Sequence, residues 1–218
     1  LVAVLRQVRP QGTLFLVAAA TFILMPFSLV MPVVIVSAIV GFITVLVVSM
    51  RRVVNPAAVL AYSVVEGVFI GAFSKLFEYL YHGIVAQAVL GTFVAAAVTL
   101  GAYKYFRVRV TNRFRKIVTI ATMGIAAMYL INLVLSLFHV STGLVQVGPT
   151  AGVLSWVISA VAVALAVANL IMDFDYIERG VRAGAPASES WRGAFGLTVT
   201  MVWLYTELLR ILSYFRSN

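Results

Sequence analysis

The sequence predicts an all-α polytopic membrane protein, and three observations lead to that prediction. First, 63% of the 218 residues are hydrophobic and only 11% are charged, with a mean hydropathy of +1.07. A soluble domain of this composition would leave large apolar areas in water, so the bilayer must be the solvent. Second, apolar runs long enough to cross a bilayer recur along the chain. Third, the polar segments between them are short, which predicts a single integral membrane domain over residues 1–218.

Seven such runs are present, and we expect each to form a transmembrane helix. Lipid offers no partner for unpaired backbone groups, and the runs lack the alternation of a barrel strand. Pro32 divides the first two runs, Asn55-Pro56 precedes the third, and Gly148-Pro149 opens the sixth. The predicted helices are Thr13 to Val30, Val33 to Met50, Ala57 to Phe77, Ile84 to Tyr105, Ile117 to Phe138, Thr150 to Met172 and Ala194 to Leu212.

The basic residues predict an orientation for these helices. If the seven runs alternate, 13 of the 16 Lys and Arg residues fall on one side, within residues 6–9, 51–52, 104–116 and 179–192. Short loops rich in Lys and Arg stay in the cytoplasm. We therefore expect an inner-membrane protein with a cytoplasmic N-terminus and an outer C-terminus. The net charge of +9 is then mainly an orientation signal and a source of attraction to anionic lipid headgroups, with no nucleic acid as partner.

Several enzyme and carrier classes are excluded by absent motifs. The chain has no cysteine, no His-Glu-x-x-His, no Gly-x-Ser-x-Gly and no phosphate-binding loop. The last run has no lysine that could carry a retinal Schiff base. No loop has the oxygen-rich spacing of a tight calcium site. We therefore expect no enzymatic activity and no bound cofactor.

Glu66 lies near the middle of the third run, ~15 Å from its start at 1.5 Å per residue. A carboxyl group at that depth must be neutralised, paired or bound to a cation. Gly67 and Gly71 follow it in a Gly-x-x-x-Gly spacing that lets another helix approach closely. Tyr62 and Ser63 share its helix face. Glu66 is either a protonated group that only fixes packing or a proton- or cation-binding site.

Glu207 and Arg210 stand three residues apart in the last run and can pair as helical neighbours. Glu207 is ~21 Å from the cytoplasmic start of its helix, about one turn beyond the depth of Glu66. The two carboxylates could therefore share a cavity and form an intramembrane cation or proton site. The alternative is that Glu207 and Arg210 form a satisfied internal salt bridge that only holds helices in register.

Asp173 and Asp175 end the sixth run at the predicted cytoplasmic mouth. Residues two apart on a helix point to nearly opposite faces, so only one of the two can face the bundle. Asn169, four residues before Asp173, marks the inward face. We therefore expect Asp173 to point inward, and Asp175 and Glu178 to be solvated.

Three segments together resemble the bacterial branch of the Bax inhibitor-1 family. They are Ala61 to Gly71 in the third run, Met172 to Ile177 after the sixth, and Leu197 to Arg210 in the seventh. The resemblance spans nearly the whole chain. It implies a bundle of six helices around a central seventh, and a pH-sensitive calcium leak gated by two aspartates near the cytoplasmic end with a nearby arginine.

Carried over residue by residue, Asp173 matches the first aspartate of that gate and Arg210 matches the arginine. Thr200 stands where the second aspartate would lie, and threonine cannot share a proton as a carboxylate would. Two functions of different class follow. One is a leak for calcium or other cations, which needs carboxylates along a hydrated route. The other is a non-conducting regulator that binds a membrane protease or a stress-response partner.

Overall fold

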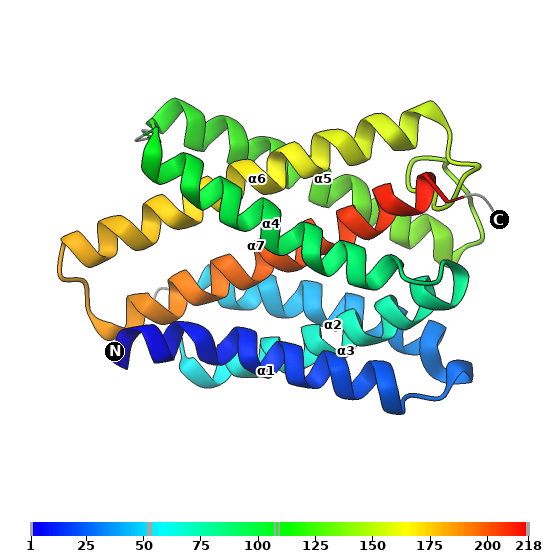
Figure 1. The fold of residues 1–218 in the computed structure, drawn as a ribbon, viewed down its shortest axis with the longest axis horizontal. Helices are drawn as coiled ribbons and strands as arrows, with labels where there is room; N and C mark the ends of the chain where they lie inside the picture. Colours follow the sequence, from blue (N-terminus) through cyan, green and yellow to red (C-terminus); the bar gives the residue numbers. More distant parts are fainter. Residues whose placement is uncertain (1, 52–53, 107, 109, 217–218) are drawn as a thin grey trace. The chain divides into compact units, whose positions relative to one another are not determined.

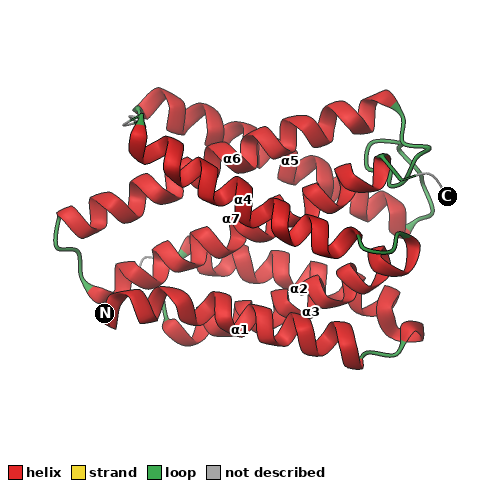
Figure 2. Ribbon diagram, in the orientation of Figure 1, coloured by secondary structure: helices red, strands yellow, loops and turns green. Residues whose placement is uncertain are grey.

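The computed structural model describes residues 2–51, 54–106, 108 and 110–216. All regular structure within these residues is helical, which confirms the all-α prediction (Figures 1 and 2). Arg52, Arg107 and Arg109, which contributed to the orientation argument, lie outside the described residues. The elements are α1 (Val2–Leu24), the 3-10 helix η1 (Phe27–Leu29), α2 (Val30–Met50), α3 (Pro56–Leu80), α4 (Ile84–Tyr105), α5 (Asn112–Leu137), α6 (Val153–Arg182) and α7 (Ala187–Tyr214).

The chain divides into two compact units. The first unit consists of Leu1–His82 and Asp175–Val202, and so contains α1, α2, α3, the end of α6 and the first part of α7. The second unit consists of Gly83–Phe174 and Trp203–Asn218, and so contains α4, α5, most of α6 and the rest of α7. The predicted site residues Glu66 and Thr200 belong to the first unit, whereas Asp173, Glu207 and Arg210 belong to the second.

The break between the first two helices was predicted at Pro32, and this was wrong. Helix α1 already ends at Leu24, and Pro26 precedes η1. Pro32 lies in the first turn of α2, which begins at Val30. Proline is compatible with that position because the first backbone N–H groups of a helix have no intrahelical acceptor. Hydropathy alone therefore could not show whether a proline within an apolar run ends one helix or lies at the start of the next.

Local capping chemistry fixes the starts of α3 and α5. The Asn55 side chain accepts a hydrogen bond from the Ala57 N–H at 2.9 Å, and Pro56 occupies the first turn of α3. Thr111 accepts from the Phe114 N–H at 3.2 Å, so α5 begins at Asn112, before the apolar run. Helix α4 has the predicted bounds, and Gly83 before it has a φ of 80° that favours glycine.

Helix α6 continues ten residues past its predicted end at Met172, to Arg182. Its polar extension carries i,i+4 ion pairs from Arg179 to Asp175 and from Arg182 to Glu178, which stabilise a helix outside an apolar environment. The helix ends where Gly184 adopts a φ of 61° and the N–H of the next residue bonds back to the Gly180 carbonyl oxygen at 3.0 Å. Asp173 and Asp175 are therefore inside α6 and not at its end.

Helices α1 and α3 of the first unit approach closely at Gly67 and Gly71. A Cβ atom on Gly67 would lie 2.9 Å from the Leu14 carbonyl oxygen, and one on Gly71 would lie 2.5 Å from the Ala18 carbonyl oxygen. The Gly-x-x-x-Gly prediction is thereby confirmed. Because the later residue of α1 meets the later residue of α3, the two helices run in the same direction, and α2 between them in sequence also packs on α3.

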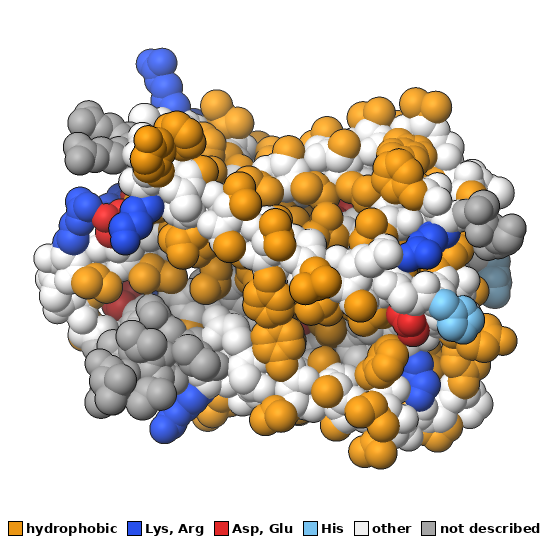
Figure 3. Space-filling view, viewed as in Figure 1, with side chains coloured by type: hydrophobic (Ala, Val, Ile, Leu, Met, Phe, Trp, Pro, Cys, Tyr) orange, Lys and Arg blue, Asp and Glu red, His pale blue; other side chains and the backbone are white. Residues whose placement is uncertain are grey.

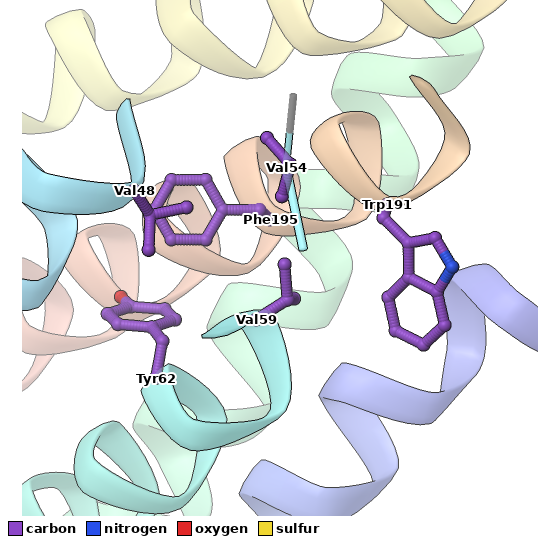
Figure 4. Close-up of a cluster of buried hydrophobic side chains, with 6 residues drawn as sticks. All are labelled: Val48, Val54, Val59, Tyr62, Trp191 and Phe195. Atoms are coloured by element: carbon purple, nitrogen blue, oxygen red, sulfur yellow. The ribbon is translucent and has the colours of Figure 1, made fainter. Parts of the chain in front are cut away.

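A buried cluster connects α3 with α2 and α7 inside the first unit (Figure 4). The Tyr62 ring packs edge-on against the Phe195 ring, with centroids 5.1 Å apart and an interplanar angle of 71°. The other members of the cluster are Val48, Val54, Val59 and Trp191. Tyr62 lies one helical turn before Glu66, so this cluster fixes the segment of α3 that carries the predicted carboxylate.

Large hydrophobic side chains are exposed along the helices, and charged side chains gather toward helix ends (Figure 3). Leu16, Met123 and Val153 are 75%, 65% and 81% exposed, as expected of side chains that face lipid. Among the described residues, six helices are long and apolar enough to cross a membrane. The apolar part of α1, Arg9–Leu24, is shorter.

Candidate functional site

Glu207 of α7 is completely buried in the second unit, at 0% exposure, and both of its carboxylate oxygens have partners. The Tyr129 hydroxyl of α5 donates to Glu207 Oε1 at 2.7 Å. Arg210 Nη1 donates to Glu207 Oε2 at 3.2 Å. The predicted pairing of Glu207 with Arg210 is therefore confirmed, with Tyr129 as a third member.

Arg210 also interacts directly with Tyr129. Its Nη1 donates to the Tyr129 hydroxyl at 2.9 Å, and its guanidinium carbon lies 4.9 Å from the centre of the tyrosine ring, within cation–π range. Side-chain hydrogen bonds from Trp203 and Ser159 also reach Glu207. We call Tyr129, Glu207 and Arg210 the buried triad. It satisfies every charged group it contains, which is the arrangement a buried ion pair needs in order to be stable.

Three more hydrogen bonds lie between the buried triad and the end of α7. Ser159 of α6 and the Tyr214 hydroxyl of α7 lie 2.9 Å apart and share a hydrogen bond. Ser213 accepts from the Gly148 N–H at 3.0 Å and donates to the Arg210 carbonyl oxygen at 2.6 Å. The loop between α5 and α6 is thus attached to the C-terminal end of α7.

Glu66 in the first unit has a different environment. Its carboxyl group lies against Gly41 of α2, where a Cβ atom would be only 2.7 Å from Glu66 Oε2. Glu66 is half-buried. No hydrogen bond or ion pair joins its carboxyl group to another residue of the described part of the chain. Of the two predicted intramembrane carboxylates, Glu207 is paired and Glu66 is not.

We expected Asp173 to be more buried than Asp175, and the structure shows the reverse. Asp175, predicted to be solvated, is 9% exposed and pairs with Arg179. Asp173 is only half-buried. Asn169, which marked the inward face of α6, does face a neighbouring helix, because its Nδ2 donates to Thr122 of α5 at 2.8 Å. The Arg179 side chain that pairs with Asp175 is itself 52% exposed.

Thr200 is buried at 6% exposure in the first unit. Asp173 and Arg210 belong to the second unit. Arg210, the third residue of the predicted gate, bonds to Glu207 and Tyr129. That Asp173, Thr200 and Arg210 act together as a pH-sensing gate stays a prediction.

A polar cluster surrounds the start of α7 in the first unit. Glu189 accepts from the Tyr176 hydroxyl and pairs with Arg192, whose Nε lies 3.3 Å from Glu189 Oε2. Arg192 Nη2 also donates to the Arg51 carbonyl oxygen at 3.2 Å, immediately after the last residue of α2. A cation at the C-terminus of a helix is favourable because it complements the exposed carbonyl groups there.

The described residues contain no group of three or more His, Asp and Glu side chains that could hold a metal ion. Calcium in proteins takes six to eight oxygen ligands, commonly from several carboxylates. Four carboxylates, those of Asp175, Glu178, Glu189 and Glu207, instead form ion pairs with arginine.

Sequence reasoning missed Tyr129, Ser159 and Gly41. Tyr129 and Ser159 stand alone in apolar runs, so a search for polar residues at membrane depth would have identified them as candidates. No signal in the sequence pairs Tyr129 with a residue 78 positions later. Gly41 is one of 15 glycines, and only the structure shows which carboxyl group it faces.

Comparison with known proteins identifies a family for this chain. The family described as Bax inhibitor 1 like matches residues 3–217, nearly the whole chain. No curated protein matches the sequence. The all-helical structure, the six long apolar helices and this match together make the protein a multi-pass membrane protein, and the chain belongs to the Bax inhibitor 1 like family.

Proposed function

We propose that this protein is a pH-sensitive cation leak of the bacterial inner membrane, with calcium as the ion that the family resemblance implies. The observation that carries the proposal is the Glu66 carboxyl group. It lies near the middle of a long apolar helix, half-buried, and has no hydrogen-bond or ion-pair partner in the described part of the chain. An ionisable group in such a place is costly unless it serves an ion or a proton.

The proposed arrangement has seven transmembrane helices, with α7 central, the N-terminus in the cytoplasm and the C-terminus outside. The parallel contact of α1 with α3 supports it, because three successive crossings would make the first and third helices run in the same direction. The burial of α7 supports its central place. Half of the residues in its most apolar segment are buried, against 6% in the corresponding segment of α5.

In this proposal Asp173, Thr200 and Arg210 form the gate at the cytoplasmic mouth, and Glu66 and Glu207 serve as the intramembrane sites. Because Thr200 cannot ionise, a gate built on it has one carboxylate where the family pattern has two. The pH response would then depend more on the intramembrane carboxylates than on the gate.

The second candidate is a membrane regulator that conducts nothing and binds a membrane protease or a stress-response partner. The buried triad favours it, since Glu207 and Arg210 are fully satisfied by side chains and need no ion. Thr200 also favours it, since the second carboxylate of the gate is absent.

Flux into liposomes separates the two candidates. Purified protein is reconstituted, and the entry of calcium and of a monovalent cation is measured for the wild type, Glu66→Gln and Glu178→Gln. Glutamine keeps the size and hydrogen bonding of the side chain but cannot ionise. Glu178 is the control, because it is an exposed carboxylate paired with Arg182. A leak predicts severe loss of flux in Glu66→Gln and none in Glu178→Gln. If liposomes with the wild-type protein show no more flux than liposomes without protein, the regulator is the better candidate.

A further inference from the structure

Glu66 and Gly41 form a small site whose occupant can be argued from its surroundings. We propose that Glu66 binds a proton and not the transported cation, as a lone carboxyl group in a niche that Gly41 opens on α2. This inference deepens the proposed function. It rests on that function in one respect, because it assigns the pH response of the proposed leak to Glu66. The proton site itself does not require that the chain conduct.

The niche exists because Gly41 has no side chain. Gly41 is buried on α2, and a Cβ atom at this position would approach Glu66 Oε2 to 2.7 Å, closer than nonbonded atoms normally come. Ser37, one turn earlier on the same helix, points its hydroxyl at carbonyl groups of its own helix, 2.5 Å from Val33 O and 3.3 Å from Val34 O. The site therefore has room for a carboxyl group, and the nearby Ser37 hydroxyl is bonded to its own helix.

Among the described residues of the first unit, no ion pair compensates an ionised Glu66. Helix α2 contains no ionisable side chain along its entire length. The residues of α1 that meet α3 at its two glycines are uncharged: Leu14, Val17, Ala18, Thr21 and Phe22. The first part of α7 packs near this segment through Phe195, on Tyr62.

The titratable and charged groups of the neighbouring helices have other positions or other partners. Tyr62, one turn earlier on α3, is in electrostatic contact with Glu66 but carries no positive charge. Lys75, further along α3, donates to the Met25 carbonyl oxygen at 2.6 Å. Glu189 and Arg192 of α7 bond to each other, and Arg192 also bonds beyond the end of α2. Arg9 lies before Leu14, the first α1 residue that meets a glycine of α3, and Glu78 lies near the end of α3.

These surroundings suit a proton better than a metal cation. A carboxylate transferred from water to an apolar site without a partner is strongly disfavoured, and protonation removes the charge. Calcium would need six to eight oxygen ligands, whereas Glu66 supplies two and no group of three acidic or histidine side chains lies among the described residues. When Glu66 loses its proton, the charged group must attract water or leave the niche, so protonation is coupled to the contact between α2 and α3.

A hydrophobic carbodiimide tests this inference, because such reagents modify carboxyl groups in their protonated form within apolar surroundings. The full chain in liposomes is treated with dicyclohexylcarbodiimide at several pH values, and the modified residue is located by mass spectrometry of peptides. We expect modification at Glu66. Above the midpoint its rate should fall about tenfold per pH unit, as for one titrating group. Millimolar calcium at constant pH should leave the rate unchanged.

Variants give the matched controls. Glu66→Gln should remove the modification. Gly41→Ala should reduce it severalfold, because the new Cβ atom displaces the carboxyl group, whereas Gly124→Ala, where a Cβ atom would have no neighbour within 4 Å, should not change it. Should Gly41→Ala fail to fold, the pH and calcium series on the wild type still decide the question.

Two results would overturn the inference: no modification of Glu66 at any pH, or protection by calcium that matches protection by raised pH. Labelling without flux would reject the leak and keep the proton site. Flux without labelling would reject the proton site and keep the leak.

Discussion

The buried triad allows a quantitative prediction about Glu207 and Arg210. Glu207 is 0% exposed and Arg210 is 9% exposed. Replacing only one partner by methionine leaves the other charge buried without compensation, which costs about 3–5 kcal/mol in the free energy of unfolding. Replacing both removes both desolvation penalties, so the double variant Glu207→Met, Arg210→Met should be considerably more stable than either single variant.

Tyr129 supplies the third variant. Tyr129→Phe removes its hydrogen bonds to Glu207 and Arg210 and keeps the ring under the guanidinium group. Hydrogen bonds to charged groups contribute about 1.5–3 kcal/mol each. Because each charged partner keeps the other, we expect a loss equal to one such bond, ~1.5–3 kcal/mol, below the ~3–5 kcal/mol of either methionine variant.

The assay is reversible unfolding in mixed micelles with increasing denaturing detergent, analysed as a double-mutant cycle. The control cycle uses Glu178 and Arg182 of α6, an i,i+4 pair whose side chains are 42% and 75% exposed. For such a surface pair the coupling should be about 0–1 kcal/mol. If the losses of Glu207→Met and Arg210→Met simply add in the double variant, the two side chains do not interact and the assignment of the triad is wrong.

Three further predictions concern packing, orientation and gating. Gly71→Val should destabilise the protein by about 1–3 kcal/mol, since its Cβ atom would meet an α1 carbonyl oxygen at 2.5 Å, whereas Gly124→Ala should not; equal melting temperatures would contradict this. A reporter fused after Asn218 should lie on the non-cytoplasmic face, and a cytoplasmic signal would mean that one of the seven helices does not cross. Thr200→Asp should move the midpoint of pH-dependent flux toward neutral through repulsion between two carboxylates; a steep neutral transition already present in the wild type and lost in Asp173→Asn would show that Asp173 has another partner.

The helices were predictable wherever apolar length and local capping agreed. Helix α4 has the predicted bounds, and α3 starts one residue early because Pro56 occupies its first turn. The end of α6 was predicted ten residues too early, because hydropathy finds only the part of a helix that lipid stabilises. Its last turns contain ion pairs between Asp175 and Arg179 and between Glu178 and Arg182. These charged residues lower the local hydropathy, so a search for apolar runs ends before them.

The site was predictable in its charged residues and not in their partners. A carboxylate inside an apolar run is conspicuous, so Glu66 and Glu207 could be selected from sequence, and the i,i+3 spacing gave the contact between Glu207 and Arg210. Contacts between helices depend on how the helices rotate about their axes, which a uniformly apolar run does not encode. Tyr129 and Gly41 are such cases. Tyr129 donates a hydrogen bond to Glu207, whereas Gly41 only leaves space for the Glu66 carboxyl group. Two glutamates with the same sequence signature therefore differ in their surroundings: Glu207 bonds to Tyr129 and Arg210, whereas the Glu66 carboxyl group lies against Gly41.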